Sequence, residues 1–95
     1  MRNWELNLEA YQKYTKQKFN IYQLNEIHWG LEDGLDVEKY ADSKFNSKQM
    51  EQIRIGLENG LDVDQYADPK LNAEEMAEIQ KGLKKEKQKE PEMKM

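Results

Sequence analysis

Residues 45–70 read FNSKQMEQIRIGLENGLDVDQYADPK, and residues 19–44 read FNIYQLNEIHWGLEDGLDVEKYADSK. The two stretches align without a gap at an offset of 26 residues. Residues 71–84, LNAEEMAEIQKGLK, begin a third copy and stop after its first half. A repeat of this length is typical of small helical units that stack on one another, because one unit alone cannot bury its apolar face.

Each copy begins with the same helix start signal. An asparagine stands where an N-cap belongs, and Gln or Glu follows three residues later, at capping-box spacing. An apolar residue before the asparagine and another at the fourth helical position form a hydrophobic staple. The asparagines are Asn20, Asn46 and Asn72, their partners are Gln23, Gln49 and Glu75, and the staples are Phe19 with Leu24, Phe45 with Met50, and Leu71 with Met76.

The end of each long helix is marked as well. Gly34 and Gly60 stand where a residue with left-handed backbone angles ends a helix. Asp36 and Asp62 follow, at positions from which they can cap a second, shorter helix over Val-x-x-Tyr-Ala. In one copy Pro69 is expected to stop that second helix, because proline disfavours helical angles at the residue before it.

A glycine also recurs inside each long helix, at Gly30, Gly56 and Gly82. A glycine in a helix interior costs about 1 kcal/mol relative to alanine. Its recurrence predicts that something packs closely against the backbone there, and the ring of Tyr40 or Tyr66, or a neighbouring helix, is the expected occupant.

These patterns predict an all-α fold, a right-handed or irregular mini-solenoid in which long and short helices alternate. Residues 1–18 are expected to form an N-terminal capping segment, and residues 19–84 the repeat body. Residues 85–95 are rich in Lys and Glu, and we expect them to form a fraying helix followed by a disordered tail.

Composition narrows the classes of protein further. The 95-residue chain has no cysteine, which excludes disulfides and thiolate metal sites. No apolar run approaches the roughly 18 residues of a membrane span, and the N-terminus has no apolar stretch typical of a secretory signal. A cytoplasmic protein is therefore the simplest interpretation.

Charge is distributed unevenly along the chain. Residues 19–83 contain 14 acidic and 6 basic side chains, a net charge of −8, whereas residues 1–18 and 84–95 each carry +2. An acidic body repels phosphate, so the sequence argues against duplex nucleic acid as a direct partner. It suits a protein partner with a basic surface, including one that itself binds nucleic acid.

Catalytic chemistry finds no support in the sequence. His28 is the only histidine, and the two serines, Ser43 and Ser47, are explained by a turn and a cap. No nucleophile with a base and an orienting group is evident, so we expect no enzyme and no catalytic residue. The carboxylates near the helix starts lack the spacing of an EF-hand loop, and we expect no metal and no cofactor.

The expected binding residues lie off the apolar stripe. Trp29, Ile55 and Lys81 share one repeat position, which lies about 160° around the helix from the core isoleucines. Tyr22 stands one heptad before Trp29 on nearly the same side. Exposed aromatic side chains of this kind anchor protein interfaces. Ile55 is the candidate least open to an explanation by cap packing.

An alternative explanation for Tyr22 and Trp29 is that the N-terminal segment folds over them. Near a chain end, an aromatic stripe is more often packed beneath a cap than free to bind. The residues available to cover it are Trp4, Leu6, Leu8, Tyr11 and Tyr14.

Carboxylates on the second long helix complete the candidate surface. Glu51 and Glu58 are the candidates for contact with a basic partner. Arg54 lies at helical spacing from both, so either of them can hold it in an ion pair.

The motif QMxxIRxGLxxGLDVxxYADP over residues 49–69 resembles a helical repeat of about 26 residues that occurs in tandem in bacterial proteins associated with phages and mobile elements. The resemblance covers residues 19–84 and implies a structural and interaction role without catalytic residues. The first copy departs from the motif, with His28 and Trp29 where the second has Arg54 and Ile55.

Three functions remain open on the sequence. The leading one is a non-catalytic protein-binding module. A second, by analogy with small mobile-element inhibitors of CRISPR nucleases, is an inhibitor that covers the basic nucleic-acid-binding surface of a host defence protein. A third is a self-associating structural element, in which Tyr22, Trp29 and Ile55 form a homodimer interface.

Overall fold

The computed structural model describes residues 11–93, and the side chains of residues 11–86. The expected all-α class is confirmed for this part of the chain, which contains helices and turns but no strand. Residues 11–15 form a short helical segment. The elements that follow are the α-helices α2 (Ile21–Glu32), α3 (Ser47–Glu58) and α4 (Ala73–Met93) and the 3₁₀ helices η1 (Val37–Lys39) and η2 (Val63–Gln65).

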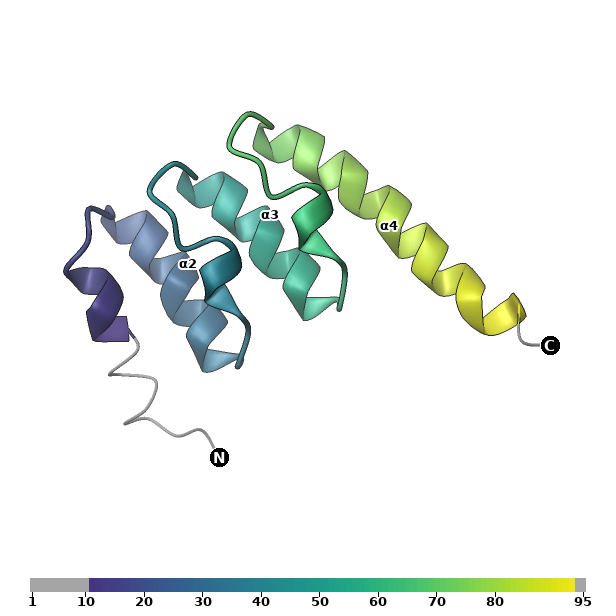
Figure 1. The fold of residues 1–95 in the computed structure, drawn as a ribbon, viewed down its shortest axis with the longest axis horizontal. Coiled ribbons are helices and arrows are strands. Elements are labelled where there is room, and N and C mark those ends of the chain that lie inside the picture. Colours follow the sequence, from purple (N-terminus) through teal and green to yellow (C-terminus); the bar gives the residue numbers. More distant parts are fainter. Residues whose placement is uncertain (1–10, 94–95) are drawn as a thin grey trace.

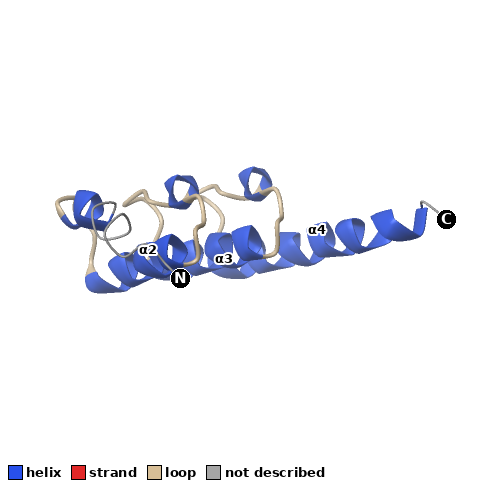
Figure 2. Ribbon diagram, turned by 90° about the horizontal axis from the view of Figure 1, so that it is seen from below, coloured by secondary structure: helices blue, strands red, loops and turns tan. Residues whose placement is uncertain are grey.

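The helices form two layers. Helices α2, α3 and α4 lie side by side in one layer, and each 3₁₀ helix is part of the connection that joins two of them (Figure 1). Seen from below, η1 and η2 stand together on one face of the α-helical layer (Figure 2). The molecule measures 48 × 35 × 15 Å. Such a thin slab explains how 37% hydrophobic residues suffice for a core.

The N-terminal ends of the three α-helices have the predicted capping boxes. In each, the asparagine side chain accepts a hydrogen bond from the backbone N–H three residues on, and the Gln or Glu side chain accepts one from the asparagine N–H, all at 2.8–2.9 Å. Each box satisfies two donors that the helix itself leaves unpaired. The pairs are Asn20 with Gln23, Asn46 with Gln49, and Asn72 with Glu75.

The predicted helix ends are confirmed where glycine is present. Gly34 and Gly60 follow α2 and α3 with φ of 72° and 70°, in the left-handed region that favours glycine. The corresponding position after α4 is Glu86, and α4 continues through it to Met93. A helix at the start of residues 85–95 agrees with the sequence analysis, and the disordered tail expected after it stays a prediction. Lys, Glu and Gln favour the helix, and no glycine ends it.

The short second helices differ from the prediction. Each is a three-residue 3₁₀ turn, and the side chains of Asp36 and Asp62 make no capping hydrogen bond. Each turn ends at a tyrosine, Tyr40 or Tyr66, whose φ of −135° or −136° lies outside the helical region. The second turn therefore ends before Pro69, which was expected to stop it. Each ring reaches back to the preceding α-helix from this turn.

Close packing of tyrosine against glycine is confirmed in two units. Tyr40 and Tyr66 are fully buried, and their hydroxyls donate hydrogen bonds to main-chain carbonyls of α2 and α3. A methyl group at Gly30 or Gly56 would overlap these hydroxyl groups. At Gly82 nothing lies within 4 Å of an added Cβ, so the expectation of close packing is wrong there, because α4 continues through the positions at which the chain turns back after α2 and α3.

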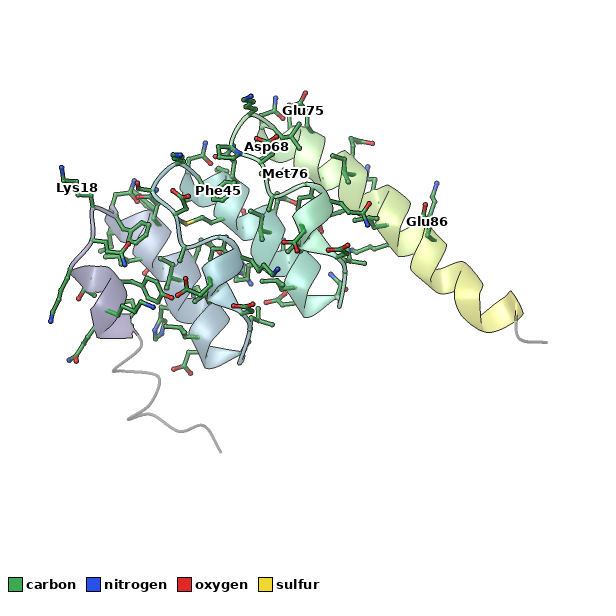
Figure 3. All side chains as sticks on the ribbon, viewed as in Figure 1. Lys18, Phe45, Asp68, Glu75, Met76 and Glu86 are labelled. Carbon is green, nitrogen blue, oxygen red and sulfur yellow. The ribbon has the colours of Figure 1, made fainter. Side chains whose placement is uncertain are left out.

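The core lies between the α-helical layer and the connections. Phe45 and Ile53 are 5% and 0% exposed, so the predicted apolar stripe faces inward. Figure 3 shows Phe45 and Met76 within the body, whereas charged side chains such as Asp68 and Glu86 project outward. The most completely buried side chains are Tyr40, Tyr66, Ile27, Met50, Ile53, Met76 and Val63.

Adjacent units are joined by a contact that recurs. Gln23 Nε2 donates a hydrogen bond of 2.6 Å to the carbonyl of Phe45, and Gln49 Nε2 donates one of 2.6 Å to the carbonyl of Leu71. Each glutamine thus closes its own capping box and also holds the first residue of the next unit.

Candidate interaction surface

Large apolar side chains are exposed at one place in the described chain, on α2. Ile21 and Tyr22 are 67% exposed, and Trp29 is 54% exposed. Tyr22 and Trp29 are two helical turns apart and lie on one side of α2, which is turned away from Ile27 in the core. Large exposed aromatic side chains are enriched at the centres of protein interfaces.

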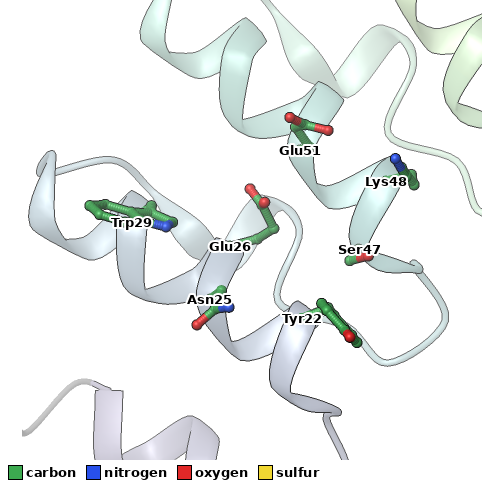
Figure 4. Close-up of a pocket in the computed structure, with 7 residues that line it drawn as sticks. All are labelled: Tyr22, Asn25, Glu26, Trp29, Ser47, Lys48 and Glu51. Carbon is green, nitrogen blue, oxygen red and sulfur yellow. The ribbon is translucent and has the colours of Figure 1, made fainter.

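These aromatic residues line an open groove between α2 and α3, with a volume of about 270 Å³. Figure 4 shows α2 contributing one wall and the first turns of α3 the other. The groove is lined by Tyr22, Asn25, Glu26 and Trp29 from α2 and by Ser47, Lys48 and Glu51 from α3.

An ion-pair network fixes one side of the groove. Arg54 Nε lies 2.7 Å from Glu26 Oε1, and Arg54 Nη1 lies 2.6 Å from Glu58 Oε2. The side chains of Arg54 and Glu26 are each 17% exposed. Burial of the guanidinium disfavours its charge, but the two carboxylates outweigh this effect and raise the pKa of Arg54. The network therefore clamps α2 to α3 beside the groove.

Three of the five predicted binding residues meet in the groove, namely Tyr22, Trp29 and Glu51. Ile55 does not line it and is only partly exposed, so it is a weaker interface candidate than the sequence suggested. Glu58 is likewise outside the groove and is held by Arg54, one of the two pairings expected for that arginine.

Among the residues that the structure describes, the N-terminal ones do not cover Tyr22 and Trp29, as the alternative explanation would require. The Tyr11 ring packs edge-on against His28, with centroids 5.5 Å apart. Tyr14 is buried in the core. Trp4, Leu6 and Leu8 lie outside the described residues. Tyr22 and Trp29 remain exposed.

Tyr14 instead binds the first 3₁₀ turn. Its hydroxyl donates a hydrogen bond to Glu38, and Lys13 Nζ lies 3.1 Å from the same carboxylate. Burial and the neighbouring carboxylate raise the pKa of Tyr14, while the hydrogen bond from Tyr14 and the pairing with Lys13 lower the pKa of Glu38. The pair Lys39–Asp64 repeats the Lys13–Glu38 contact one unit later, at 2.8 Å.

Four lining residues were missed by the sequence reasoning: Asn25, Glu26, Ser47 and Lys48. Helical spacing from Tyr22 places Asn25 and Glu26 near it. The two residues of α3 depend on how far α3 is displaced along α2. Glu26 pairs with a residue 28 positions later, not 26, and the repeat offset alone does not give that displacement.

Among the residues that the structure describes, no group of three or more His, Cys, Asp or Glu side chains could hold a metal ion. The imidazole of His28 lies between the rings of Tyr11 and Trp29, at 5.5 Å from each. It therefore has an aromatic packing environment.

Internal comparison of the units separates inner from outer positions. Inward positions keep their character, as in Ile27, Ile53 and Ile79. The outer position of Tyr22 holds Lys48 and Glu74 in the other units. The other outer positions vary in the same way, as in Asn25, Glu51 and Ala77, and in Trp29, Ile55 and Lys81.

Comparison with known proteins finds no matching family model, and no curated protein or solved structure with significant similarity. Within residues 11–93, none of the helices has both the length and the apolar character required to cross a membrane.

Proposed function

We propose that the chain is a non-catalytic protein-binding module, a helical-repeat mini-solenoid that binds its partner in the groove between α2 and α3. The observation that carries the proposal is the exposure of Tyr22 and Trp29, at 67% and 54%, on the walls of that groove. Large aromatic side chains left in water are costly for a small domain, and their burial in an interface is favourable.

The surrounding architecture supports this proposal. Capping boxes and the Glu26–Arg54 pair hold both walls of the groove in place, so binding requires little ordering of the backbone. The motif QMxxIRxGLxxGLDVxxYADP, which resembles tandem repeats of phage and mobile-element proteins, supports the proposal of an interaction role and of an origin in such proteins.

A second candidate function follows from charge. With a net charge of −8 over residues 19–83, the body complements a basic surface. An inhibitor that covers the nucleic-acid-binding surface of a host defence protein would use this charge for rapid, oriented association. Self-association through the same aromatic residues is the competing use of the groove.

The test is quantitative affinity capture from a bacterial lysate with the full chain as bait. Three baits are compared: wild type, the double variant Tyr22→Ala/Trp29→Ala, and Ile21→Ala. Ile21 is as exposed as Tyr22 but does not line the groove, so it is the matched control. We expect partners that are retained by wild type and Ile21→Ala and lost with the double variant.

Two results would contradict the proposal. One is a set of captured proteins that all three baits retain equally. The other is a concentration-dependent dimer of wild type in sedimentation, abolished by the double variant, which would assign the groove to self-association. Loss of binding on raising the salt concentration would support the basic-surface partner, because long-range charge attraction is screened.

A further inference from the structure

We infer that the groove accepts a cationic side chain, an arginine in preference to a lysine, from a segment of the partner protein, with Glu51 as its ion-pair partner and Tyr22 and Trp29 packed against it. This inference rests on the proposed function and specifies the chemistry of the partner.

Glu51 is the first observation. Its carboxylate lies in the groove and is only partly exposed, and it forms no ion pair or hydrogen bond with any residue that the structure describes. The neighbouring carboxylates of Glu26 and Glu58 are both held by Arg54. A carboxylate in a groove that has no partner among the described residues is available to an incoming cation, and a charge-assisted hydrogen bond to it is stronger than a neutral one.

The spacing of the aromatic residues is the second observation. Tyr22 and Trp29 are seven residues apart, so they are separated by about 10.5 Å along α2. Asn25 and Glu51 line the groove with them (Figure 4). A guanidinium group placed there would contact the face of an aromatic ring and hydrogen-bond to a carboxylate at the same time. An ammonium group would offer the charge without the planar stacking surface, and this difference favours arginine.

Lys48 gives the inference a second, opposite test. It lies on the same wall as Glu51, is exposed, and pairs with no described acid. Its charge opposes the entry of a cation. If the groove binds arginine, removing the Lys48 charge must strengthen binding, whereas removing the Glu51 charge must weaken it.

The experiment is a display selection of random 15-residue peptides on the full chain, with counter-selection on Tyr22→Ala/Trp29→Ala. We expect the groove-dependent peptides to share an arginine. Replacing that arginine by citrulline, which keeps the shape and removes the charge, should lower the affinity about tenfold, as expected for a charge-assisted hydrogen bond.

The same peptides are then measured on charge variants of the protein. Glu51→Gln should lower the affinity about tenfold. Lys48→Gln should raise it about two- to threefold, as for an exposed charge. Glu86→Gln is the matched control, because Glu86 is an exposed acid on α4, remote from the groove, and we expect less than a twofold change.

The outcomes separate this inference from the proposed function. Groove-dependent peptides that lack a basic residue, or that bind Glu51→Gln as well as wild type, would overturn the inference and leave the proposed function standing. Equal losses with Glu51→Gln and Glu86→Gln would show a diffuse effect of net charge and would also overturn it. A selection that yields no peptide dependent on Tyr22 and Trp29 would overturn both.

Discussion

Two alanine substitutions at equivalent helix positions should have opposite effects on stability. Gly56 and Gly82 occupy the same position in α3 and α4. A methyl group at Gly56 would overlap the Tyr66 hydroxyl oxygen and would lie 2.8 Å from Val63 Cγ1, whereas at Gly82 it would meet nothing within 4 Å. Helix propensity alone favours alanine by about 1 kcal/mol at both positions.

The magnitude at Gly56 follows from these contacts. To admit a methyl group, the Tyr66 ring must move and give up its hydrogen bond of 2.9 Å to the Gln52 carbonyl. Leaving those buried groups unpaired costs about 1–3 kcal/mol. Crowding against Val63 costs about 1–3 kcal/mol more. Less the gain in helix propensity, Gly56→Ala should lower the free energy of unfolding by about 3 kcal/mol, and Gly82→Ala should raise it by about 1 kcal/mol.

Urea denaturation followed by far-UV circular dichroism measures both changes. In thermal melts of a domain this size, each kcal/mol corresponds to about 4–8 °C in Tm. The double variant Gly56→Ala/Tyr66→Phe is the control for mechanism. Without the hydroxyl, the closest overlap disappears, so the second substitution should cost less in the Gly56→Ala background than in wild type. A shift of Tm in the same direction for Gly56→Ala and Gly82→Ala would refute the reasoning.

Three further predictions concern ionisable groups. Arg54→Gln should lower the free energy of unfolding, measured by urea denaturation, by about 1–2 kcal/mol, because it leaves the partly buried carboxylate of Glu26 unpaired. Adding Glu26→Gln should recover part of this loss, because it removes the unpaired charge. The hydrogen bond from Tyr14 lowers the pKa of Glu38 below its ordinary 4.5, so its contribution to stability is present above pH 4.5 and is lost as the pH falls through the lower folded pKa. Glu38→Gln should therefore flatten the fall of Tm as the pH falls below about 4.5. Burial raises the pKa of Tyr66 from 10.0 to about 12, so stability present below pH 10 is lost as the pH rises through 12, and Tyr66→Phe should flatten that loss in melts at alkaline pH.

Much of the local structure could be predicted because it depends on residues close together in sequence. The capping box of Asn46 and Gln49 and the left-handed Gly60 each involve a few neighbouring positions. Packing of Tyr66 on Gly56 was also predictable. A glycine inside a helix is destabilising, so its presence suggests close packing, and the tyrosine ten residues later is large enough to pack there.

The predictions from sequence failed where the structure depends on contacts between residues far apart in the chain. Asp62 has the right spacing for a cap, but the backbone must turn toward α3 so that Tyr66 reaches its site, and a three-residue 3₁₀ turn satisfies that geometry. Predicting the candidate groove would have required the packing of two helices in addition to local sequence. Tyr22 and Glu51 line the same groove only because α3 packs on α2 in a particular register, and that register depends on side-chain packing of the two helices together.

The repeat also bears on the proposal that the outer face binds a protein partner. A module that follows a repeating ligand, such as a nucleic-acid backbone, needs equivalent contacts from each unit, as helical-repeat readers provide. Here the position of Tyr22 becomes lysine and then glutamate, and that of Trp29 becomes isoleucine and then lysine. The inner positions repeat because every unit must stack in the same way. The outer positions are not constrained by stacking and can differ from unit to unit. A face whose chemistry changes from aromatic to charged across three units suits a partner surface that does not itself repeat, and this supports the proposal of a folded protein partner with a local basic site.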